Sequence, residues 1–353
     1  MSYLFKELLV FNRPKMNQFR IIGAGICMLI VLFIGYFSGN MQFASFGSLG
    51  IFTFLYYQHL PAKQLLQRML TIGAYFYLCM IVGMLTSHIP WLVPLIVGLV
   101  AFIGRVGFRL YHIAKPGSFF SIMIVTMGSS TRIPLDKLLL TSSYFLIGVA
   151  VSLIMGFVIL MTERTPTVPL PTLSLINRLQ SDPGAILDGI FYATTLFFIA
   201  YLSYGLAFHN SYWMVVSCAS ILMGDNLRAI FHRNIQRIFG TTIGLGIAAF
   251  IFSMPLSLPM TLCLIAILFT IVEFFIPRNY GLANFFTTPL ALLLSTLVQQ
   301  QYHYSLLSDR LLGIAIGSVV GLLSAWIFTT GLKFYHRAIL PEQINNPFEN
   351  TKS

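Results

Sequence analysis

Long runs of apolar residues, separated by short polar segments, dominate the pattern of this chain. Most runs approach the roughly 20 residues that an α-helix needs to cross a hydrocarbon layer about 30 Å thick. The alternation of apolar and polar residues that is typical of β-barrel strands is absent from the sequence. The second, fifth and eighth runs are short. We therefore expect an all-α, polytopic membrane protein with about twelve transmembrane helices, near residues 20–39, 42–57, 66–88, 91–108, 117–129, 138–161, 186–206, 212–224, 237–254, 258–275, 281–298 and 311–332.

The composition excludes a soluble fold. Only 9% of the 353 residues are charged and 57% are hydrophobic, whereas an ordinary soluble domain has roughly 25% charged residues. The four cysteines all lie in apolar runs without paired spacing, which indicates buried side chains rather than metal or redox chemistry. The seven histidines show no spacing typical of metal ligands. We expect neither a metal nor a cofactor.

Basic residues are unevenly distributed over the polar segments. Eighteen Lys and Arg residues fall on the side of the N-terminus, and only Arg132, Lys137 and Arg310 fall on the other side. Because Lys and Arg accumulate on the cytoplasmic side of membrane proteins, we expect both termini in the cytoplasm. The net charge of +11 then reflects topology and attraction to anionic lipid head groups. It does not indicate a nucleic-acid partner.

The two halves of the chain resemble each other. At a constant offset of 169 residues, charged and aromatic positions coincide, namely Arg68 with Arg237, Arg109 with Arg278, and Tyr111 with Tyr280. We expect a first six-span repeat with a cytoplasmic N-terminus in residues 1–164, a proline-containing cytoplasmic linker in 165–184, a second six-span repeat in 185–340, and a cytoplasmic tail in 341–353. An even number of spans gives both repeats the same orientation, so their pseudo-symmetry axis should follow the membrane normal.

Small residues recur at helical spacing in several spans. The rows are Gly148, Ser152 and Gly156 in the sixth span, Gly313, Gly317, Gly321 and Ala325 in the twelfth, and Gly240, Gly244 and Gly246 in the ninth. Helices in lipid associate through close backbone approach at such residues. We expect these faces to form helix contacts rather than the lining of a pore.

The second repeat resembles the fusaric acid resistance protein family, also called the aromatic acid exporter family. The resemblance rests on HNSYWMVVSCASILMGDNLRAIFHRNIQRIFGTTIGLGIAAF, residues 209–249, and FIPRNYGLANFFTTPLALLL, residues 275–294. The same unit is similar to the transmembrane region of plant aluminium-activated malate transporters. The first repeat matches only through Arg68, Arg109 and Tyr111. The resemblance implies a carrier or channel for organic anions, aromatic or other carboxylic acids, in the bacterial inner membrane, usually an exporter.

Arginines related by the repeat could provide a route for an anion. A carboxylate loses several kcal/mol on leaving water, and arginine stays charged and binds it with two parallel donors. We expect Arg68, Arg237, Arg109 and Arg278 to form a basic ring around a cytoplasmic mouth; the alternative for each is an interfacial anchor on lipid phosphate. Tyr111, Tyr280, Tyr212 and Trp213 could stack on an aromatic acid or belong to the interfacial aromatic belt.

Glu273 is the acidic residue placed deepest in a span, where a charge is costly and indicates a partner or a relay. Because the offset places Glu273 next to Arg105, we expect these two residues to face each other. A fixed charge pair and a proton-coupling carboxylate both stay open. Asp225 and Arg233 are candidates for gating, although Asp225 could simply pair or cap locally. Asp309 and Arg310 are expected to form a helix-start charge pair, with an outer gate as the alternative.

Several functions fit this pattern. The first is a secondary transporter that exports organic anions through a basic path between the repeats, without enzymatic activity. Alternatives are an importer of a carboxylate siderophore, a passive anion channel, a membrane-embedded lipid-modifying enzyme and a non-transporting assembly protein. The expected partners are a small organic anion and membrane lipid, with a homodimer or accessory export proteins in addition.

Overall fold

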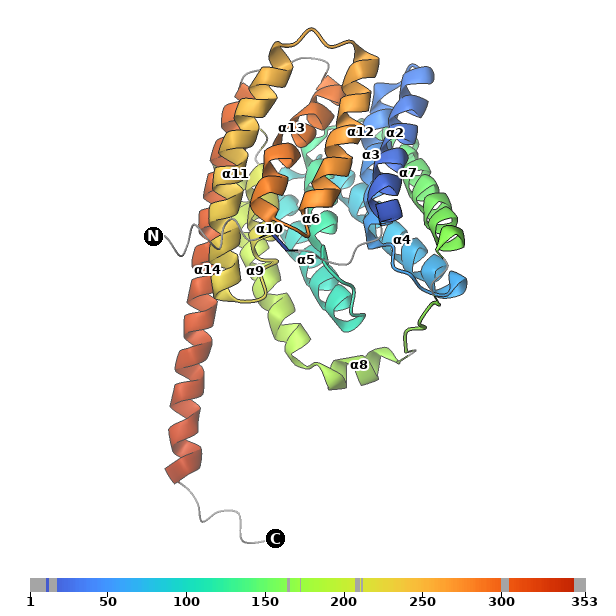
Figure 1. Ribbon diagram of the computed structural model, residues 1–353. Helices are drawn as coiled ribbons and strands as arrows, with labels where there is room; N and C mark the ends of the chain where they lie inside the picture. The colour runs from blue at the N-terminus through green and yellow to red at the C-terminus, as the bar shows by residue number, and fades with distance from the viewer. Residues whose placement is uncertain are drawn as a thin grey trace.

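The computed structural model describes residues 11–12, 18–163, 166–171, 173–206, 210, 212–299 and 305–345, with side chains described to residue 297 and from 306 to 334 in the last two ranges. Within these ranges the chain is helical and has no strand (Figure 1). The elements are α2 (Gln18–Phe37), α3 (Met41–Gly50), η1 (Ile51–Tyr56), α4 (Ala62–Thr86), η2 (Pro90–Leu92), α5 (Val93–Leu110), α6 (Phe119–Ser130), α7 (Leu135–Thr162), α8 (Leu175–Ser181), α9 (Gly184–Gly205), α10 (Tyr212–Ile221), α11 (Leu227–Ser253), α12 (Leu258–Phe275), α13 (Tyr280–Gln299) and α14 (Ser305–Asn345).

Nine helices in the described part of the chain are long and apolar enough to cross a membrane: α2, α4, α5 with η2, α7, α9, α11, α12, α13 and α14. Their outer faces expose large apolar side chains such as Leu139, Ile154 and Phe250. Lipid is as apolar as these side chains, so such exposure is expected in a bilayer. Every predicted span coincides with a helix. The expectation of an all-α, polytopic membrane protein is confirmed.

The three short predicted spans are not complete crossings. α6 has 12 residues, and α3 and α10 have 10 each. At 1.5 Å per residue these helices reach about 15–18 Å, roughly half of the hydrocarbon thickness. α3 is prolonged by η1, whereas α6 and α10 stay short and pack against each other. The prediction of about twelve transmembrane helices, with the second, fifth and eighth short, is thereby refined to nine helices of full length within the described residues, because an apolar run does not distinguish a full helix from a half helix joined to a loop.

The bundle has two distinct ends. Figure 1 shows α8 below the bundle and the turn between α11 and α12 at the other end. We call these the α8 end and the opposite end. α14 extends beyond the bundle at the α8 end. The α8 end is the one for which the basic residues predict a cytoplasmic location.

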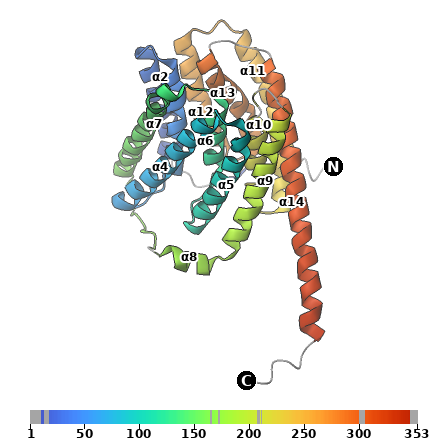
Figure 2. The ribbon, with the colours of Figure 1, turned by 180° about the vertical axis from the view of Figure 1, so that it is seen from behind.

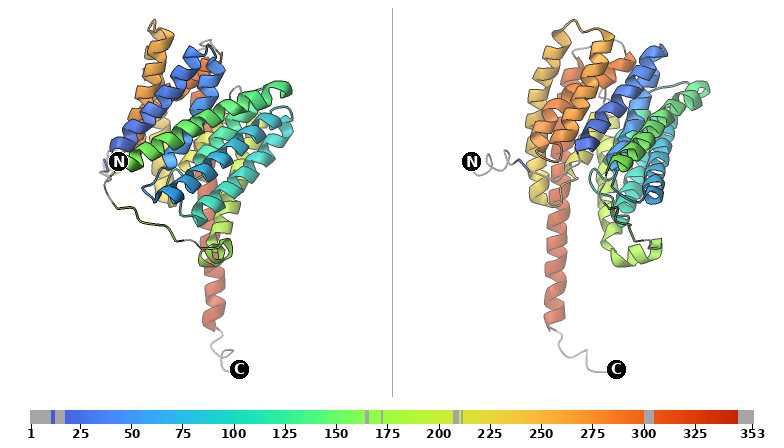
Figure 3. Two further views of the ribbon diagram at one scale, coloured as in Figure 1. Left: turned by 90° about the vertical axis from the view of Figure 1, so that its right-hand side faces the viewer. Right: turned by 45° about the vertical axis from the view of Figure 1, so that its right-hand side comes forward.

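The two halves of the chain pack through equivalent pairs of helices. In the first half α3 packs against α7 and α4 against α6, and in the second α10 packs against α14 and α11 against α13. Two further equivalent pairs join the halves, α5 with α9 (Figure 2) and α2 with α12. Figure 3 shows the blue N-terminal helices beside the orange helices of the second half. The halves therefore interlock along two interfaces, and α6 meets α10 between them.

Small residues permit the closest of these contacts. A Cβ atom at Gly148 would overlap the carbonyl oxygen of Gly47 on α3, and one at Gly317 would overlap that of Met214 on α10. The predicted small-residue rows of α7 and α14 are thus helix contacts. Gly246 differs, because a Cβ atom there would have no atom within 4 Å. The expectation that Gly246 packs in this way is wrong.

The segment between the two halves is attached to the bundle. Buried Arg178 of α8 donates hydrogen bonds to the carbonyl oxygens of Leu110, Pro171 and Leu173. Residues 165 and 172 of the predicted linker lie outside the described residues. At the other end of the second repeat, α14 continues to Asn345, so the predicted tail 341–353 begins inside this helix, and 346–353 lie outside the described residues.

Candidate functional site

Helices α11 and α13 present polar side chains to each other inside the second half. The Asn226 side chain accepts a hydrogen bond from the Ala229 backbone N–H and starts α11. Arg233 and Arg237 follow, four residues apart and therefore on one face. On α13, Tyr280 and Asn284 share a face in the same way.

A close helix contact brings these faces within reach of each other. A Cβ atom at Gly240 would lie 2.7 Å from the Gly281 carbonyl oxygen, so α11 and α13 approach at backbone distance. Gly244 faces Asn284 and Thr288 in the same manner. The glycines thereby set the separation at which the arginines of α11 meet the polar residues of α13.

Arg237 is the centre of a buried polar network. It is 4% exposed, and its guanidinium donates to Tyr280 Oη at 3.0 Å, to Asn284 Oδ1 at 3.3 Å and to Ser217 Oγ at 3.2 Å. Arg233 lies over the Tyr280 ring, 4.0 Å from its centroid. These three hydrogen-bond partners of Arg237 are all neutral, and no carboxylate of the described residues forms an ion pair with it.

The short helix α10 supplies the remaining side of the network. Ser217 Oγ, which accepts from Arg237, also donates to the Ile314 carbonyl oxygen of α14 at 3.0 Å. Four residues earlier, the Trp213 ring lies under the guanidinium of Arg310, 4.0 Å from the centroid. α10 thus links α11 and α13 to the first turns of α14.

At the α8 end the network opens into a pocket of about 610 Å³, here called the basic pocket. Its lining contains the cationic side chains of Lys115, Arg228, Arg233 and Arg278, together with Tyr280. Lys115 comes from the loop between α5 and α6 and pairs with Asp225 at 2.7 Å. The first half therefore contributes one wall of a pocket that belongs mainly to the second half.

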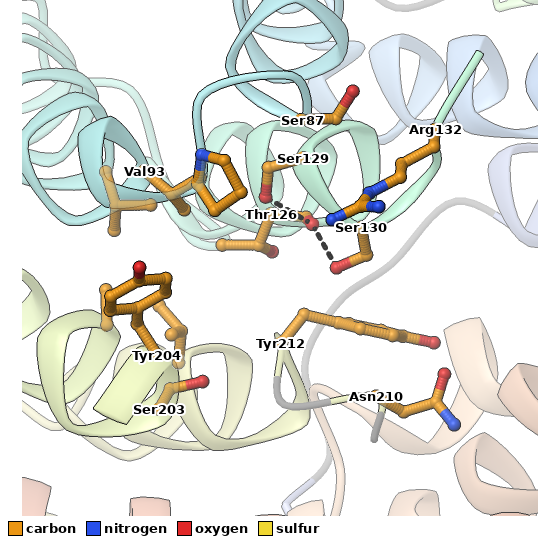
Figure 4. Close-up of a pocket in the computed structure, with 14 residues that line it drawn as sticks. Ser87, Val93, Thr126, Ser129, Ser130, Arg132, Ser203, Tyr204, Asn210 and Tyr212 are labelled. Carbon is orange, nitrogen blue, oxygen red and sulfur yellow. Dashed lines mark hydrogen bonds between the residues drawn. The ribbon is translucent and has the colours of Figure 1, made fainter. Parts of the chain in front are cut away.

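A second pocket, of about 450 Å³, lies at the opposite end between α5 and α6 of the first half and α9 and α10 of the second. Hydroxyl groups dominate its lining, so we call it the serine-lined pocket. Figure 4 shows Ser129, Ser130 and Arg132 on one side and Ser203, Tyr204, Asn210 and Tyr212 on the other. The ring of Tyr212 lies 4.4 Å from that of Trp213.

Polar and aromatic contacts extend from each pocket to helix α10. From the basic pocket they run through Tyr280 and Arg237 to Ser217. Four residues earlier on α10, Trp213 contacts Tyr212, which lines the serine-lined pocket. Helix α10 therefore lies between the two sets of contacts.

The four arginines expected to form a ring occupy different environments. Arg237 is in the buried network and Arg278 lines the basic pocket with its guanidinium over Phe274. Arg109 donates to Asp182 at 2.6 and 2.8 Å, which holds the pKa of that carboxyl below its usual range. Arg68, the sequence counterpart of Arg237, is half-buried on α4. The expected ring is therefore not formed: Arg237 is buried in the network, Arg278 lines the basic pocket, and the other two arginines lie elsewhere.

Three other expectations for single residues are also corrected. Tyr111 lies beneath Arg178, 4.6 Å from ring centroid to guanidinium, and so belongs to the attachment of α8. Arg310 does not form a helix-start pair, because Asp309 accepts from Asn210 at 3.4 Å while Arg310 is turned into the protein and is 2% exposed. Asp225 pairs with Lys115 of the first half, which is distant in sequence, whereas a local pair or cap was expected.

Glu273 and Arg105 do not face each other. Arg105 binds Asp188 of α9 through two hydrogen bonds of 2.8 and 3.2 Å. Glu273, on α12, interacts electrostatically with Arg20 of α2 instead. The expectation failed because equivalent positions in two repeats lie in two different interfaces rather than against each other.

Sequence reasoning missed three members of the site. Arg310 was expected to form a helix-start pair with Asp309, whereas it is buried against Trp213 of α10, which is distant in sequence. Ser217 and Asn284 carry no charge and do not stand out in an apolar run. Their spacing from Trp213 and Tyr280, four residues in each case, was the available signal. No group of three His, Cys, Asp or Glu side chains able to hold a metal occurs in the described part.

The helices that build the network coincide with a known sequence family. Residues 194–324 match the family model described as fusaric acid resistance protein-like. This range begins inside α9, ends inside α14, and includes all of α10, α11, α12 and α13. The resemblance to the fusaric acid resistance proteins is thus confirmed for the second half of this membrane protein.

A curated relative is also a membrane protein. The uncharacterized membrane protein YvaC of Bacillus subtilis (strain 168) is 32% identical to the chain over 179 residues. The match covers 49% of this chain and 27% of YvaC, so the chain spans about a quarter of that relative. No solved structure matches the chain.

Proposed function

We propose that this protein moves organic anions across a membrane, between the basic pocket and the serine-lined pocket. The observation that carries the proposal is Arg237, a buried arginine whose hydrogen-bond partners among the described residues are the neutral side chains of Ser217, Tyr280 and Asn284. Removing a guanidinium from water costs several kcal/mol unless an anion pairs with it. An anionic solute that passes the network would pair transiently with Arg237. The pairing would offset part of the free energy that the solute loses when it leaves water.

The charge distribution of the basic pocket also favours an anionic solute. Lys115, Arg228 and Arg278 give its mouth a positive potential, which concentrates anions and repels cations. Among the described residues no acidic side chain lines this pocket, and Asp225, which lies between two lining residues in sequence, pairs with Lys115. A small carboxylate is therefore the solute that this entrance favours.

Aromatic rings along the route favour a carboxylate on an aromatic group. Tyr280 lines the basic pocket, and Tyr212 lines the serine-lined pocket next to Trp213. Ring faces bind aromatic solutes and also accept cations, as Arg233 and Arg310 do here. We further propose that the α8 end is cytoplasmic and that the membrane is the bacterial inner membrane. We also propose that transport is outward, as is usual for the fusaric acid resistance proteins that the chain resembles.

Flux of radiolabelled benzoate into proteoliposomes tests this function. The parent protein should transport benzoate, Arg237→Gln should lose most of the flux, and Tyr280→Phe, which removes one hydroxyl acceptor, should reduce it about 2- to 10-fold. Lys63→Gln, at an exposed position near the start of α4, is the matched control and should transport like the parent. Equal flux in the parent, in Arg237→Gln and in empty liposomes would contradict the proposal.

A further inference from the structure

Arg310 is the largest fully buried side chain of the described part of the protein. Its guanidinium lies over the Trp213 ring at 4.0 Å. Neither Nε nor Nη1 of Arg310 has a hydrogen-bond partner among the described residues, and the same holds for Nε1 of Trp213. Three buried N–H groups without acceptors therefore belong to two side chains in contact.

Within the described residues, no carboxylate forms an ion pair with Arg310. Arg237, which is another cation, and Tyr212 act on it electrostatically. Asp309, the acid next to Arg310 in sequence, accepts a hydrogen bond from Asn210 instead. Burial without a counter-charge is unfavourable, and each buried donor without an acceptor costs about 1–3 kcal/mol in addition. An anion at this place would remove both penalties at once.

We infer that Arg310 and Trp213 form a binding site for a carboxylate group at the opposite end of the route. The guanidinium supplies charge-assisted donors and the indole N–H supplies a neutral one. Tyr212, which touches Trp213 and lines the serine-lined pocket, connects the site to that pocket. The site would hold the carboxylate while the aromatic part of the solute occupies the serine-lined pocket. The identity of this solute rests on the proposed function, whereas the need for an anion rests on Arg310 alone.

Equilibrium binding of radiolabelled benzoate to the purified full-length protein tests the site, with methanesulfonate as the background anion. Arg310→Met should weaken binding about 10- to 100-fold, because hydrogen bonds to a charged group are lost. Trp213→Phe keeps the packing of a ring but removes the N–H group, and should weaken binding about 2- to 10-fold. Lys137→Gln, an exposed cation at the same end on α7, is the control and should bind like the parent.

Thermal unfolding provides a second measurement that does not depend on transport. Benzoate should raise the unfolding temperature of the parent and of Lys137→Gln, but not of Arg310→Met, because a ligand stabilises only the state that binds it. Trp213→Phe serves the same purpose if Arg310→Met does not fold. Benzoate binding that is unchanged in both variants would overturn the site. Binding of chloride without binding of benzoate would also overturn it, because the site would then accept an inorganic anion only.

The site and the transport function can fail separately. Benzoate flux that persists in Arg310→Met, together with unaltered binding, would remove the site and leave the function. Binding that depends on Arg310 in a protein that moves no benzoate would support the site and remove the function. Both measurements use the same preparation of the same variants.

Discussion

Arg105 on α5 holds Asp188 on α9 through two parallel hydrogen bonds, Nε to Oδ2 at 2.8 Å and Nη2 to Oδ1 at 3.2 Å. The equivalent interface, between α2 and α12, contains Arg20 and Glu273. An offset of 168 residues relates Arg20 to Asp188 and also Arg105 to Glu273. Each interface between the halves thus has one basic and one acidic residue at equivalent positions, with the two signs exchanged.

This pairing predicts a measurable coupling across the interface of the halves. The side chains of Arg105 and Asp188 are 27% and 21% exposed, so water screens the pair only in part. A double-mutant cycle with Arg105→Gln and Asp188→Asn should give a coupling of about 1 kcal/mol in the free energy of unfolding. The same cycle for Lys115 and Asp225, which are 54% and 77% exposed, should give clearly less. Equal couplings would show that burial does not strengthen the first pair.

We predict that Glu273 is not a proton carrier. It interacts electrostatically with Arg20 in the interface of α2 with α12, and it is not among the described residues that line the basic pocket or the serine-lined pocket. In Glu273→Gln the pH dependence of benzoate flux should stay as in the parent, since no proton site on the route is removed. Asp188→Asn, which removes the acidic charge of the other interface between the halves, is the control. A flux that no longer responds to pH in Glu273→Gln alone would establish the relay and contradict this prediction.

The contact between α10 and α14 predicts strong sensitivity to a single methyl group. Gly317→Ala would place a Cβ atom on the Met214 carbonyl oxygen, so α10 and α14 must separate. We expect a loss of about 1–3 kcal/mol in stability, or no folded protein. Gly331→Ala on the same helix has no atom within 4 Å and should be neutral or slightly stabilising. Thermal unfolding of the two variants side by side checks the prediction, and similar midpoints would refute it.

The sequence was sufficient for the helices and for some of the faces through which they pack. Apolar runs separated by polar segments identify membrane helices because every backbone group in lipid must be satisfied within a helix. Gly148 and Gly317 indicated the tightest contacts to the backbone of a neighbouring helix, because only small residues allow helices in lipid to approach so closely. The hydropathy of a run such as 117–129 did not show whether it forms a complete crossing or the half helix α6.

The site was predictable only in part, because a repeat offset gives equivalence and not contact. It placed Glu273 next to Arg105, yet these residues lie in separate interfaces. It also grouped Arg109 with Arg237, although Asp182 and Asp188 bind Arg109 and no carboxylate of the described residues pairs with Arg237. Tyr280 and Trp213 were identified through motifs. Arg310 was missed, since burial of a charged side chain depends on residues far away in sequence.

The ion pair between Lys115 and Asp225 predicts how the basic pocket selects its solute. Asp225→Asn removes a negative charge beside Lys115 at the mouth of the pocket, and thereby raises the positive potential that an entering anion meets. We expect the KM for benzoate flux to fall about two- to threefold at low salt, which is the effect of one unit charge several ångströms away in water. The pair is exposed, so folding should be unaffected. In 0.5 M background salt the difference should vanish, because the screening length is then about 4 Å.

The control is Asp136→Asn, which removes an exposed acid at the start of α7 at the opposite end and should leave KM unchanged. A lower KM that persists at high salt would mean that Asp225 acts through local structure and not through its charge.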